Sequence, residues 1–316
     1  MSERVVLAHR GGLDPAPLIG ALTAGGARVV TVAVDLGDSG EDPATTRARA
    51  LAGGAVEAVV VDARDEFADR YCLPALRANA LRPVAALTRS LFAEHLVRVA
   101  RRHGATAVAH GRTGADRARF EAAVNALAPD LDVIAPPVGP TPTARPEPPG
   151  GAPDWTAEPR DPEELVVTFD RGRPVAVDGE TMTVRQAVQE LNLRSGARGV
   201  RRPKGVHAYQ APGAAALVTA HRELEDLTLE PDLADFKRQV ERRWAALVHG
   251  GQWFSPLRRA LDGFIDNTQL HVSGEVRLVL HGGRTVVTGR RGEESPFDST
   301  PGCAPPRRLP SKIAAT

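Results

Sequence analysis

Five short apolar runs in the first 137 residues set the strongest limit on the fold. They occupy residues 4–8, 28–34, 56–61, 105–109 and 132–135. The runs are continuous in Val, Leu and Ala instead of alternating with polar residues, as is typical of parallel strands covered on both faces. Helical patterns separate them. In residues 87–103, for example, one face carries Leu91, Phe92, Leu96 and Val99. The alternation predicts an α/β domain with a doubly wound parallel sheet over residues 1–137.

A second, α+β domain is expected over residues 164–292. The runs LVVTFD and PVAVDG flank the turn Arg171-Gly172-Arg173 and predict a hairpin, and EVRLVLHG and RTVVTGR predict two further strands. Two helices between these pairs carry apolar stripes. The predicted stripes are Phe236, Val240, Trp244 and Leu247 on one helix and Leu257, Leu261, Phe264 and Ile265 on the next. Pro-rich composition predicts a linker at residues 138–163 and a disordered tail at residues 293–316.

Composition excludes several classes of partner. A net charge of +1 predicts no general attraction to nucleic acid or to an anionic membrane, and 42% hydrophobic residues with 25% charged residues indicate a soluble globular protein. No apolar stretch approaches the roughly 18 residues of a membrane helix. Cys72 and Cys303 form no CxxC pair, and the histidines lack metal-ligand spacing, so no metal site is predicted. With an amino terminus unlike a signal peptide, these features predict a cytoplasmic protein.

The segment AHRGGLDPA, residues 8–16, follows the first predicted strand and has two interpretations. Paired glycines at Gly11 and Gly12, ahead of a helix, let backbone N–H groups bind a phosphate. Alternatively, Asp14 is a helix N-cap, Pro15 is the first helical residue, and the glycines only make the turn. The segment matches neither GxxxxGK[ST] nor GxGxxG, so both interpretations stay open.

The chain resembles the argininosuccinate synthase family, whose members are N-type ATP pyrophosphatases with an adenine nucleotide alpha hydrolase-like fold. AHRGGLDPA occupies the place of the family loop AYSGGLDTS, and AHGRTG and VDARDEFADRYCLPALRANAL have clear family counterparts. Residues 217–280 are similar to the family's carboxy-terminal domain along their whole length. The likeness runs almost from end to end.

The resemblance implies a reaction and a set of binding residues. Family members use ATP, usually with magnesium, to adenylate citrulline, and aspartate then displaces AMP to give argininosuccinate and pyrophosphate. The usual assembly is a homotetramer. The implied ATP and phosphate contacts are Ala8, Arg10, Gly11, Gly12, Asp14 and Gly111. The implied substrate contacts are Thr113, Asp116, Arg119 and Tyr209. No single catalytic residue is singled out.

Departures from the family pattern are concentrated in these loops. Arg10 replaces a serine, and Pro15 and Ala16 replace a Thr-Ser pair, so three hydroxyl donors are missing. Arg10 either binds phosphate or fills the loop and pairs with Asp14. The segment HGRTGADRARFE is two residues shorter than its family counterpart and lacks the Asn that contacts both amino-acid substrates. On a simpler interpretation, its polar residues Asp116, Arg119 and Glu121 form the first turns of a helix that carries Phe120 and Val124 inward.

These departures lead to three hypotheses about activity. The first is an argininosuccinate synthase-like protein with lost or strongly reduced family activity, assembled with itself or, as a non-catalytic subunit, with an active relative. The second is an ATP-dependent ligase that adenylates a different substrate. The third is an ordinary argininosuccinate synthase, which needs substitutes for the missing groups.

Overall fold

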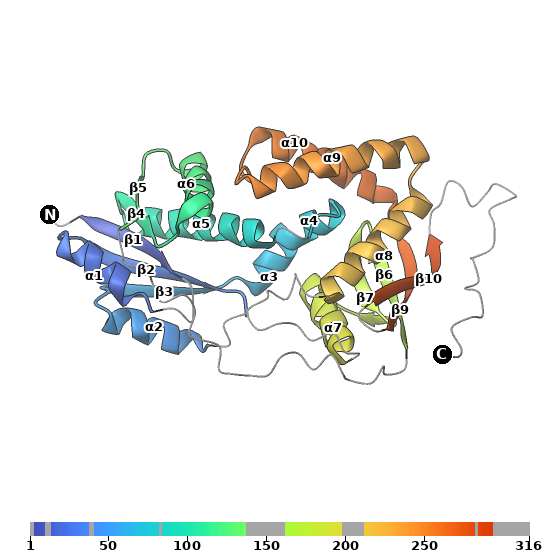
Figure 1. Ribbon diagram of the computed structural model, residues 1–316, viewed down its shortest axis with the longest axis horizontal. Coiled ribbons are helices and arrows are strands. Elements are labelled where there is room, and N and C mark those ends of the chain that lie inside the picture. The colour runs from blue at the N-terminus through green and yellow to red at the C-terminus, as the bar shows by residue number, and fades with distance from the viewer. Residues whose placement is uncertain are drawn as a thin grey trace, which may run out of the picture. The chain divides into compact units, whose positions relative to one another are not determined.

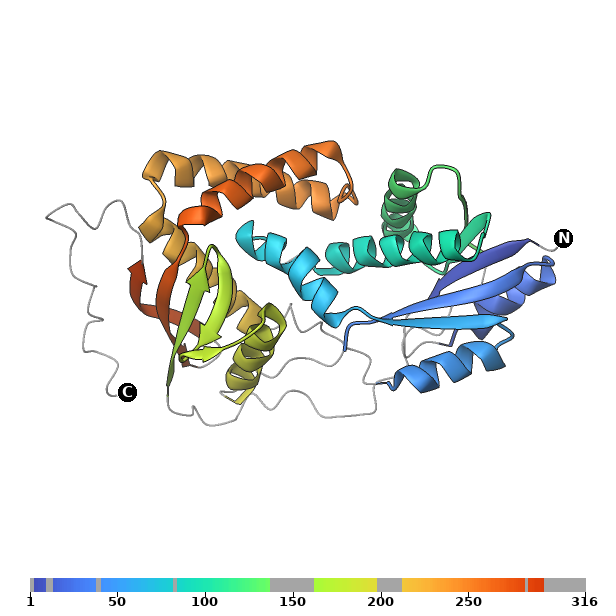
Figure 2. The same cartoon turned by 180° about the vertical axis from the view of Figure 1, so that it is seen from behind.

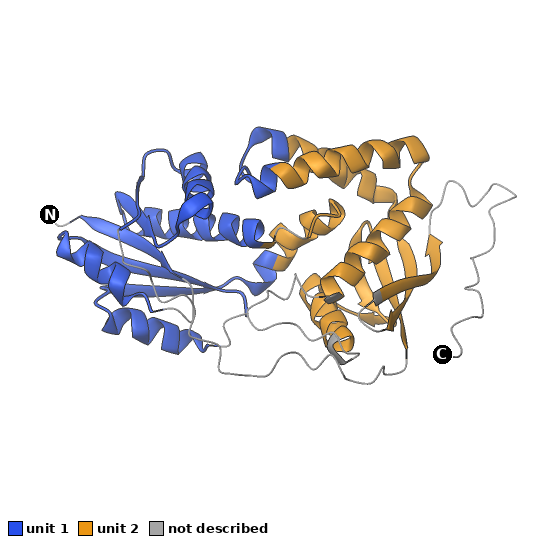
Figure 3. Ribbon diagram, viewed as in Figure 1, with its two compact units in different colours: residues 1–67, 85–152, 247–258 blue, residues 68–84, 153–246, 259–316 orange. Residues whose placement is uncertain are grey.

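A computed structural model of the chain shows two compact units (Figure 3). Unit 1 comprises Met1–Phe67, Ala85–Ala152 and Leu247–Arg258, and unit 2 comprises Ala68–Val84, Pro153–Ala246 and Arg259–Thr316. The structure describes residues 3–9, 14–37, 41–81, 84–136, 162–197, 212–281 and 284–292. Arg10, Gly11, Gly12 and Tyr209 lie outside these ranges, as do the predicted tail and the predicted linker up to residue 161.

Unit 1 is built on a parallel five-stranded sheet (Figure 1). Its strands are β1 (Arg4–His9), β2 (Arg28–Asp35), β3 (Glu57–Asp62), β4 (Ala107–His110) and β5 (Asp132–Ile134). Their order is β3-β2-β1-β4-β5, and every neighbouring pair is parallel. This confirms the predicted doubly wound sheet, and each strand lies within two residues of its predicted bounds. The chain reverses direction across the sheet between β1 and β4, which makes that pair the topological switch point.

Helices cover both faces of this sheet. α1 (Ala16–Ala24) and α2 (Pro43–Ala52) lie on one face, and α5 (Val84–Arg102) and α6 (Gly114–Leu127) lie on the other, with the short α3 (Arg64–Phe67) after β3 (Figures 1 and 2). The predicted apolar face of α5 is confirmed, since its four residues are at most 4% exposed. Burial on both faces explains why the strands are continuous in Val, Leu and Ala.

Unit 2 contains an antiparallel five-stranded sheet. Its strands are β6 (Glu163–Asp170), β7 (Arg173–Val177), β8 (Glu180–Thr181), β9 (Gly274–His281) and β10 (Arg284–Gly292), in the order β10-β9-β6-β7-β8. The predicted pairs β6–β7 and β9–β10 are both antiparallel. The chain's remaining described helices are the π-helix η1 (Ala68–Cys72), α4 (Leu73–Arg77), α7 (Val184–Ala197), α8 (Pro212–Thr228), α9 (Pro231–His249), α10 (Pro256–Thr268) and the 3-10 helix η3 (Gln269–His271). Residues 247–258, where α9 ends and α10 begins, belong to unit 1.

The predicted apolar stripes on α9 and α10 are only partly buried. Val240, Trp244 and Leu247 are buried, but Phe236 is 52% exposed, so the predicted stripe on α9 extends beyond the buried part of the helix. The ring of Phe236 instead meets that of Phe264 edge to face, with centroids 5.3 Å apart. Each ring thus covers part of the other at the surface. Leu257, in the stripe predicted on α10, is 44% exposed.

The turn between β6 and β7 provides a test of local packing. Arg171 and Gly172 have φ values of 47° and 70°, as a type I′ hairpin turn requires. A Cβ atom on Gly172 would lie 1.9 Å from Oε1 of Gln269. Gly172→Ala is therefore expected to lower the free energy of unfolding by about 1–3 kcal/mol, because a well-packed side chain must move. Chemical denaturation measures the change.

Gly179 supplies the matched control for this substitution. It has a φ of 80° in the next turn, and an added Cβ there would meet nothing within 4 Å. Gly179→Ala carries the same backbone cost without the collision, so its loss should be the smaller one. Equal losses for the two variants would contradict the packing argument.

Candidate functional site

The carboxyl ends of β1 and β4 define the expected ligand site of unit 1. Ala8 lies in register with His110 on the neighbouring strand, so the segments after these residues leave the sheet side by side. Ligands of doubly wound sheets bind beyond the strand ends at this switch point. The structure therefore brings together the described parts of the two loops that the sequence singled out, those around Ala8 and Gly111. Arg10, Gly11 and Gly12 lie outside the described residues.

Asp14 is engaged with the first turn of α1. Its Oδ1 atom accepts a hydrogen bond from the backbone N–H of Ala16, at 3.0 Å. Pro15 is the N-cap residue and not the first helical residue, because its carbonyl accepts the first intrahelical hydrogen bond, from Ile19. The capping interpretation of Asp14 is thus right about the contact and wrong by one residue about where the helix starts.

Gly111 packs closely against α1. A Cβ atom on Gly111 would lie 2.8 Å from Cδ1 of Leu18. That methyl is the end of a flexible side chain and could turn away. The approach of α1 to the end of β4 is therefore only a weak structural reason for glycine at this position.

Asp116 is clamped between two guanidinium groups. Its Oδ1 atom accepts a hydrogen bond from Nε of Arg89 at 2.8 Å, and its Oδ2 atom accepts one from Nη1 of Arg112 at 2.5 Å. Burial raises the pKa of Asp116, but Arg112 and Arg89 outweigh it and hold the pKa below its ordinary value. Both carboxylate oxygens thus accept hydrogen bonds from side chains of the protein itself, while the Asp116 side chain remains 42% exposed.

Arg89 is a site residue that sequence reasoning missed. It is 4% exposed, on the buried face of α5, and Nε and Nη2 both lie 2.8 Å from Oδ1 of Asp116. Within the described ranges its Nη1 atom is buried with no hydrogen-bond partner. The signal was available, since Arg89 stands three residues before Phe92 and seven before Leu96, inside an apolar stripe. A buried guanidinium with a spare donor fits a carboxylate of a ligand.

Arg112 and His110 complete this polar cluster. The guanidinium of Arg112 lies over the ring of Phe120, 4.6 Å from its centroid. Nδ1 of His110 accepts the backbone N–H of Arg112 at 3.1 Å, and its Nε2 lies 3.4 Å from Oε1 of Glu121. Burial lowers the pKa of His110, and Arg112 lowers it further, against an opposing effect of Glu121. The cationic charge of this cluster therefore resides on its arginines.

The remaining predicted substrate residues are Thr113, Arg119 and Tyr209. Thr113 is exposed at the N-cap position of α6 and makes no side-chain capping hydrogen bond. The backbone of Arg119 lies against Gly251, where an added Cβ would come within 2.8 Å of the Arg119 carbonyl. Phe120 and Val124 are fully buried, which confirms that α6 turns these two residues inward. Tyr209 lies outside the described residues.

A second polar cluster lies at the carboxyl ends of β2 and β3. Asp35 Oδ2 accepts a hydrogen bond from Nη2 of Arg64 at 2.8 Å, and its Oδ1 accepts the backbone N–H of Gly37 at 2.8 Å. The edge of the sheet that carries the ligand loops is thus polar across several strands. In the described part of the chain, no group of three or more His, Cys, Asp or Glu residues could hold a metal ion. No described helix is long and apolar enough to span a membrane.

Comparison with known families accounts for both units. The family model of the arginosuccinate synthase N-terminal HUP domain matches residues 4–145, and that of the arginosuccinate synthase C-terminal domain matches residues 146–302. HUP domains of this family in general bind ATP. The observed α/β architecture, with its parallel sheet followed by an antiparallel one, agrees with this match. The chain belongs to the argininosuccinate synthase family of ligases.

Proposed function

We propose that this protein is an argininosuccinate synthase-like ligase in which the family reaction is lost or strongly reduced. The observation that carries the proposal is the clamp on Asp116. A carboxylate that is already paired with two cations attracts the ammonium group of an amino-acid substrate less strongly than an unpaired one. Arg89 and Arg112 occupy one oxygen each, at 2.8 and 2.5 Å. A citrulline or aspartate molecule that approached Asp116, which is 42% exposed, would compete with these two charge-assisted pairs for its charge.

The phosphate loop supports the same proposal. Pro15 has no N–H to offer, and the N–H of Ala16 is directed at Asp14. The family's hydroxyl donors are absent from residues 10, 15 and 16. Loss of one preorganised donor typically costs about 2.7–4 kcal/mol of transition-state stabilisation. The remaining backbone donors would hold pyrophosphate less well than a loop with its hydroxyls.

The first half of the family reaction tests the proposal. Adenylation of citrulline can be followed without aspartate, as exchange of labelled pyrophosphate into ATP in the presence of magnesium. We expect no citrulline-dependent exchange above a sample that lacks citrulline. Exchange that grows with citrulline concentration would overturn the proposal, because it requires a working phosphate loop and a working citrulline site.

A second candidate function is an ATP-dependent ligase that adenylates a different substrate. The spare Nη1 donor of Arg89 favours it, since a buried cationic donor without a partner among the described residues fits a carboxylate. In this case Ala8, Arg10, Gly11, Gly12, Asp14 and Gly111 would hold ATP with its magnesium, and ATP would supply the adenylyl group. The same exchange assay with a panel of carboxylic acids distinguishes the candidates. Acid-dependent exchange that is lost in Arg89→Leu would favour the second.

Assembly and location follow from family membership as part of the proposal. We expect a cytoplasmic protein that forms a homo-oligomer, in the family manner a tetramer, or a hetero-oligomer as the non-catalytic partner of an active relative. In the hetero-oligomer the contacts of Asp116 with the two arginines would not lower the activity of the assembly, because the partner's site would perform the reaction.

A further inference from the structure

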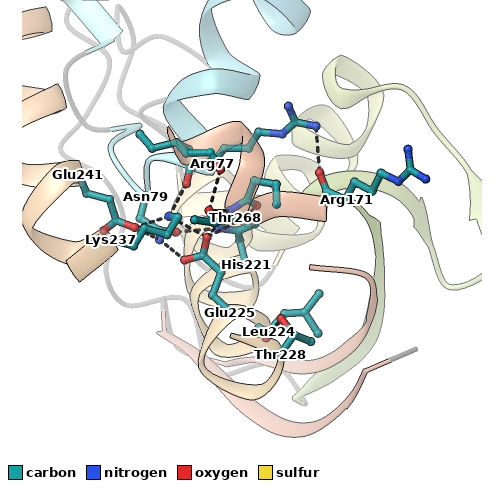
Figure 4. Close-up of polar contacts among 12 residues, drawn as sticks. Arg77, Asn79, Arg171, His221, Leu224, Glu225, Thr228, Lys237, Glu241 and Thr268 are labelled. Carbon is teal, nitrogen blue, oxygen red and sulfur yellow. Dashed lines mark hydrogen bonds and ion pairs between the residues drawn. The ribbon is translucent and has the colours of Figure 1, made fainter. Parts of the chain in front are cut away.

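A buried cluster of ionisable side chains links α8 and α9 in unit 2 (Figure 4). His221 and Glu225 come from α8, and Lys237 and Glu241 come from α9. None of the four is more than 7% exposed. The Nζ atom of Lys237 lies 2.8 Å from Oε1 of Glu225 and 2.5 Å from Oε1 of Glu241. Charges so deeply buried persist only where other charges and hydrogen bonds compensate them.

Two amide side chains in this cluster have their orientation fixed by the carboxylates. Nδ2 of Asn79 donates to Glu225 Oε2 at 2.6 Å and to Glu241 Oε1 at 2.9 Å. Nε2 of Gln269 donates to Glu225 Oε1 at 2.7 Å. An ionised carboxylate only accepts hydrogen bonds, so in both amides the nitrogen must face the carboxylate. The two amide oxygens consequently face His221.

The imidazole of His221 therefore meets an acceptor at each ring nitrogen. Its Nδ1 lies 2.9 Å from Oδ1 of Asn79, and its Nε2 lies 2.7 Å from Oε1 of Gln269. A neutral imidazole has one N–H and one lone pair, so one of these contacts would set a lone pair against an amide oxygen. Only the imidazolium donates to both.

The net charge of the cluster also favours a protonated His221. Lys237 contributes one positive charge, and Glu225 and Glu241 contribute two negative charges, so a neutral His221 would leave the buried cluster with a net charge of −1. One additional proton makes the cluster neutral. Arg77, the other cation that faces His221, has its own partners: Asp266 at 2.9 Å and the Arg171 carbonyl at 2.9 Å.

Burial of the ring disfavours protonation of His221. Desolvation lowers the pKa of His221, and Lys237 and Arg77 act in the same direction, while Glu225 and the hydrogen bond to Gln269 raise it. Together these contributions favour the neutral ring. A neutral ring, however, would set its lone pair against an amide oxygen at 2.7 or 2.9 Å, and a buried mismatch of that kind costs as much as an unmade hydrogen bond or more. The two acceptors at the ring nitrogens therefore raise the pKa of His221 above its ordinary value.

We propose that the cluster binds one proton beyond that of Lys237, held on His221, and that the protonated cluster fixes residues 73–80, the crossover segment, to α8 and α9. The segment is attached at two points. Lys237 donates to the carbonyl of Arg77 at 2.7 Å, and Asn79, which has a left-handed φ of 47°, joins His221 to both carboxylates. Loss of the proton removes one of the contacts that hold Asn79.

The sign of the pH dependence follows from this assignment. In the unfolded chain His221 titrates near its ordinary value of about 6.5. Stabilisation by the proton is fully present below that pH and is lost as the pH rises through the higher folded-state value. Between the two values the unfolding equilibrium constant should rise by up to about tenfold per pH unit.

Nitrogen NMR of the full chain labelled with ¹⁵N-histidine tests the proposal. The ring signals of His221 are identified by their absence in His221→Gln. At pH 7.5 the wild-type protein is expected to show both ring nitrogens protonated. A single neutral tautomer of His221 in the folded protein at that pH would overturn the proposal.

A pair of glutamine variants on α8 sharpens the test. Glu225→Gln removes one negative charge and the acceptor that orients both amides, so His221 should become neutral at pH 7.5. Glu223→Gln alters a 41% exposed side chain on the same helix, paired with Arg290 at 3.1 Å, and should leave His221 protonated. A His221 that stays protonated in Glu225→Gln would refute the role of the carboxylate. If that variant does not fold, the wild-type spectrum decides alone.

Discussion

Replacing Lys237 with methionine is expected to lower the free energy of unfolding by about 3–5 kcal/mol, the usual cost of removing one partner from a buried ion pair. Lys237 is 1% exposed and binds Glu225, Glu241 and the Arg77 carbonyl. Methionine fills a similar volume but leaves two carboxylates and a carbonyl without their shared donor. Guanidinium denaturation followed by tryptophan fluorescence measures the shift, because Trp244 is fully buried in the same unit.

Arg238 provides the control on the same helix. Its side chain is 48% exposed and pairs with Asp226 at 2.8 Å at the surface. Surface pairs contribute little to stability, so Arg238→Met should move the unfolding midpoint only slightly. If Lys237→Met proved no more harmful than Arg238→Met, the buried cluster would not be the stabilising centre of α8 and α9 that the contacts indicate.

Much of the fold could be predicted from the sequence because burial determines the pattern of apolar residues along each strand and helix. Strands covered on both faces are continuous in Val, Leu and Ala, and this pattern located β1 to β5 within two residues. The exposure of Phe236 could not be predicted from the same kind of pattern. Helical periodicity reports which residues share a face but not whether another element covers that face, and the ring of Phe236 packs against that of Phe264 at the surface.

The candidate site was harder to predict because its contacts join distant parts of the chain. The loop around Gly111 and the position of Asp116 were found through family resemblance, but the clamp on Asp116 was not. Arg89 lies 27 residues before Asp116 and meets it only when α5 and α6 pack on the same face of the sheet. The buried cluster depends on still longer separations, since His221 lies 142 residues after Asn79. The place of Arg89 inside an apolar stripe is a local signal, but no local motif reveals the partners in either arrangement.

The overall family reaction is expected to proceed at least about 10²–10³-fold more slowly than in a family member with an intact loop, since this is the typical cost of one lost oxyanion-type donor. Three hydroxyl donors are missing, Ala16 directs its N–H at Asp14, and Asp116 is occupied by Arg89 and Arg112. These losses affect both the leaving pyrophosphate and the amino-acid substrates. Substitution of one residue should therefore not restore the rate, and Arg112→Ala alone is expected to remain inactive.

The most direct test is the formation of labelled argininosuccinate from labelled aspartate, with saturating ATP, magnesium and citrulline, at protein concentrations matched to a family enzyme with an intact loop. Both proteins are assayed alone and mixed, so that any contribution of this chain to an active relative is visible. We expect product from the intact enzyme and at most a trace, at least about 10²-fold less, from this chain alone. Product formation by this chain alone at a rate close to that of the intact enzyme would contradict this expectation.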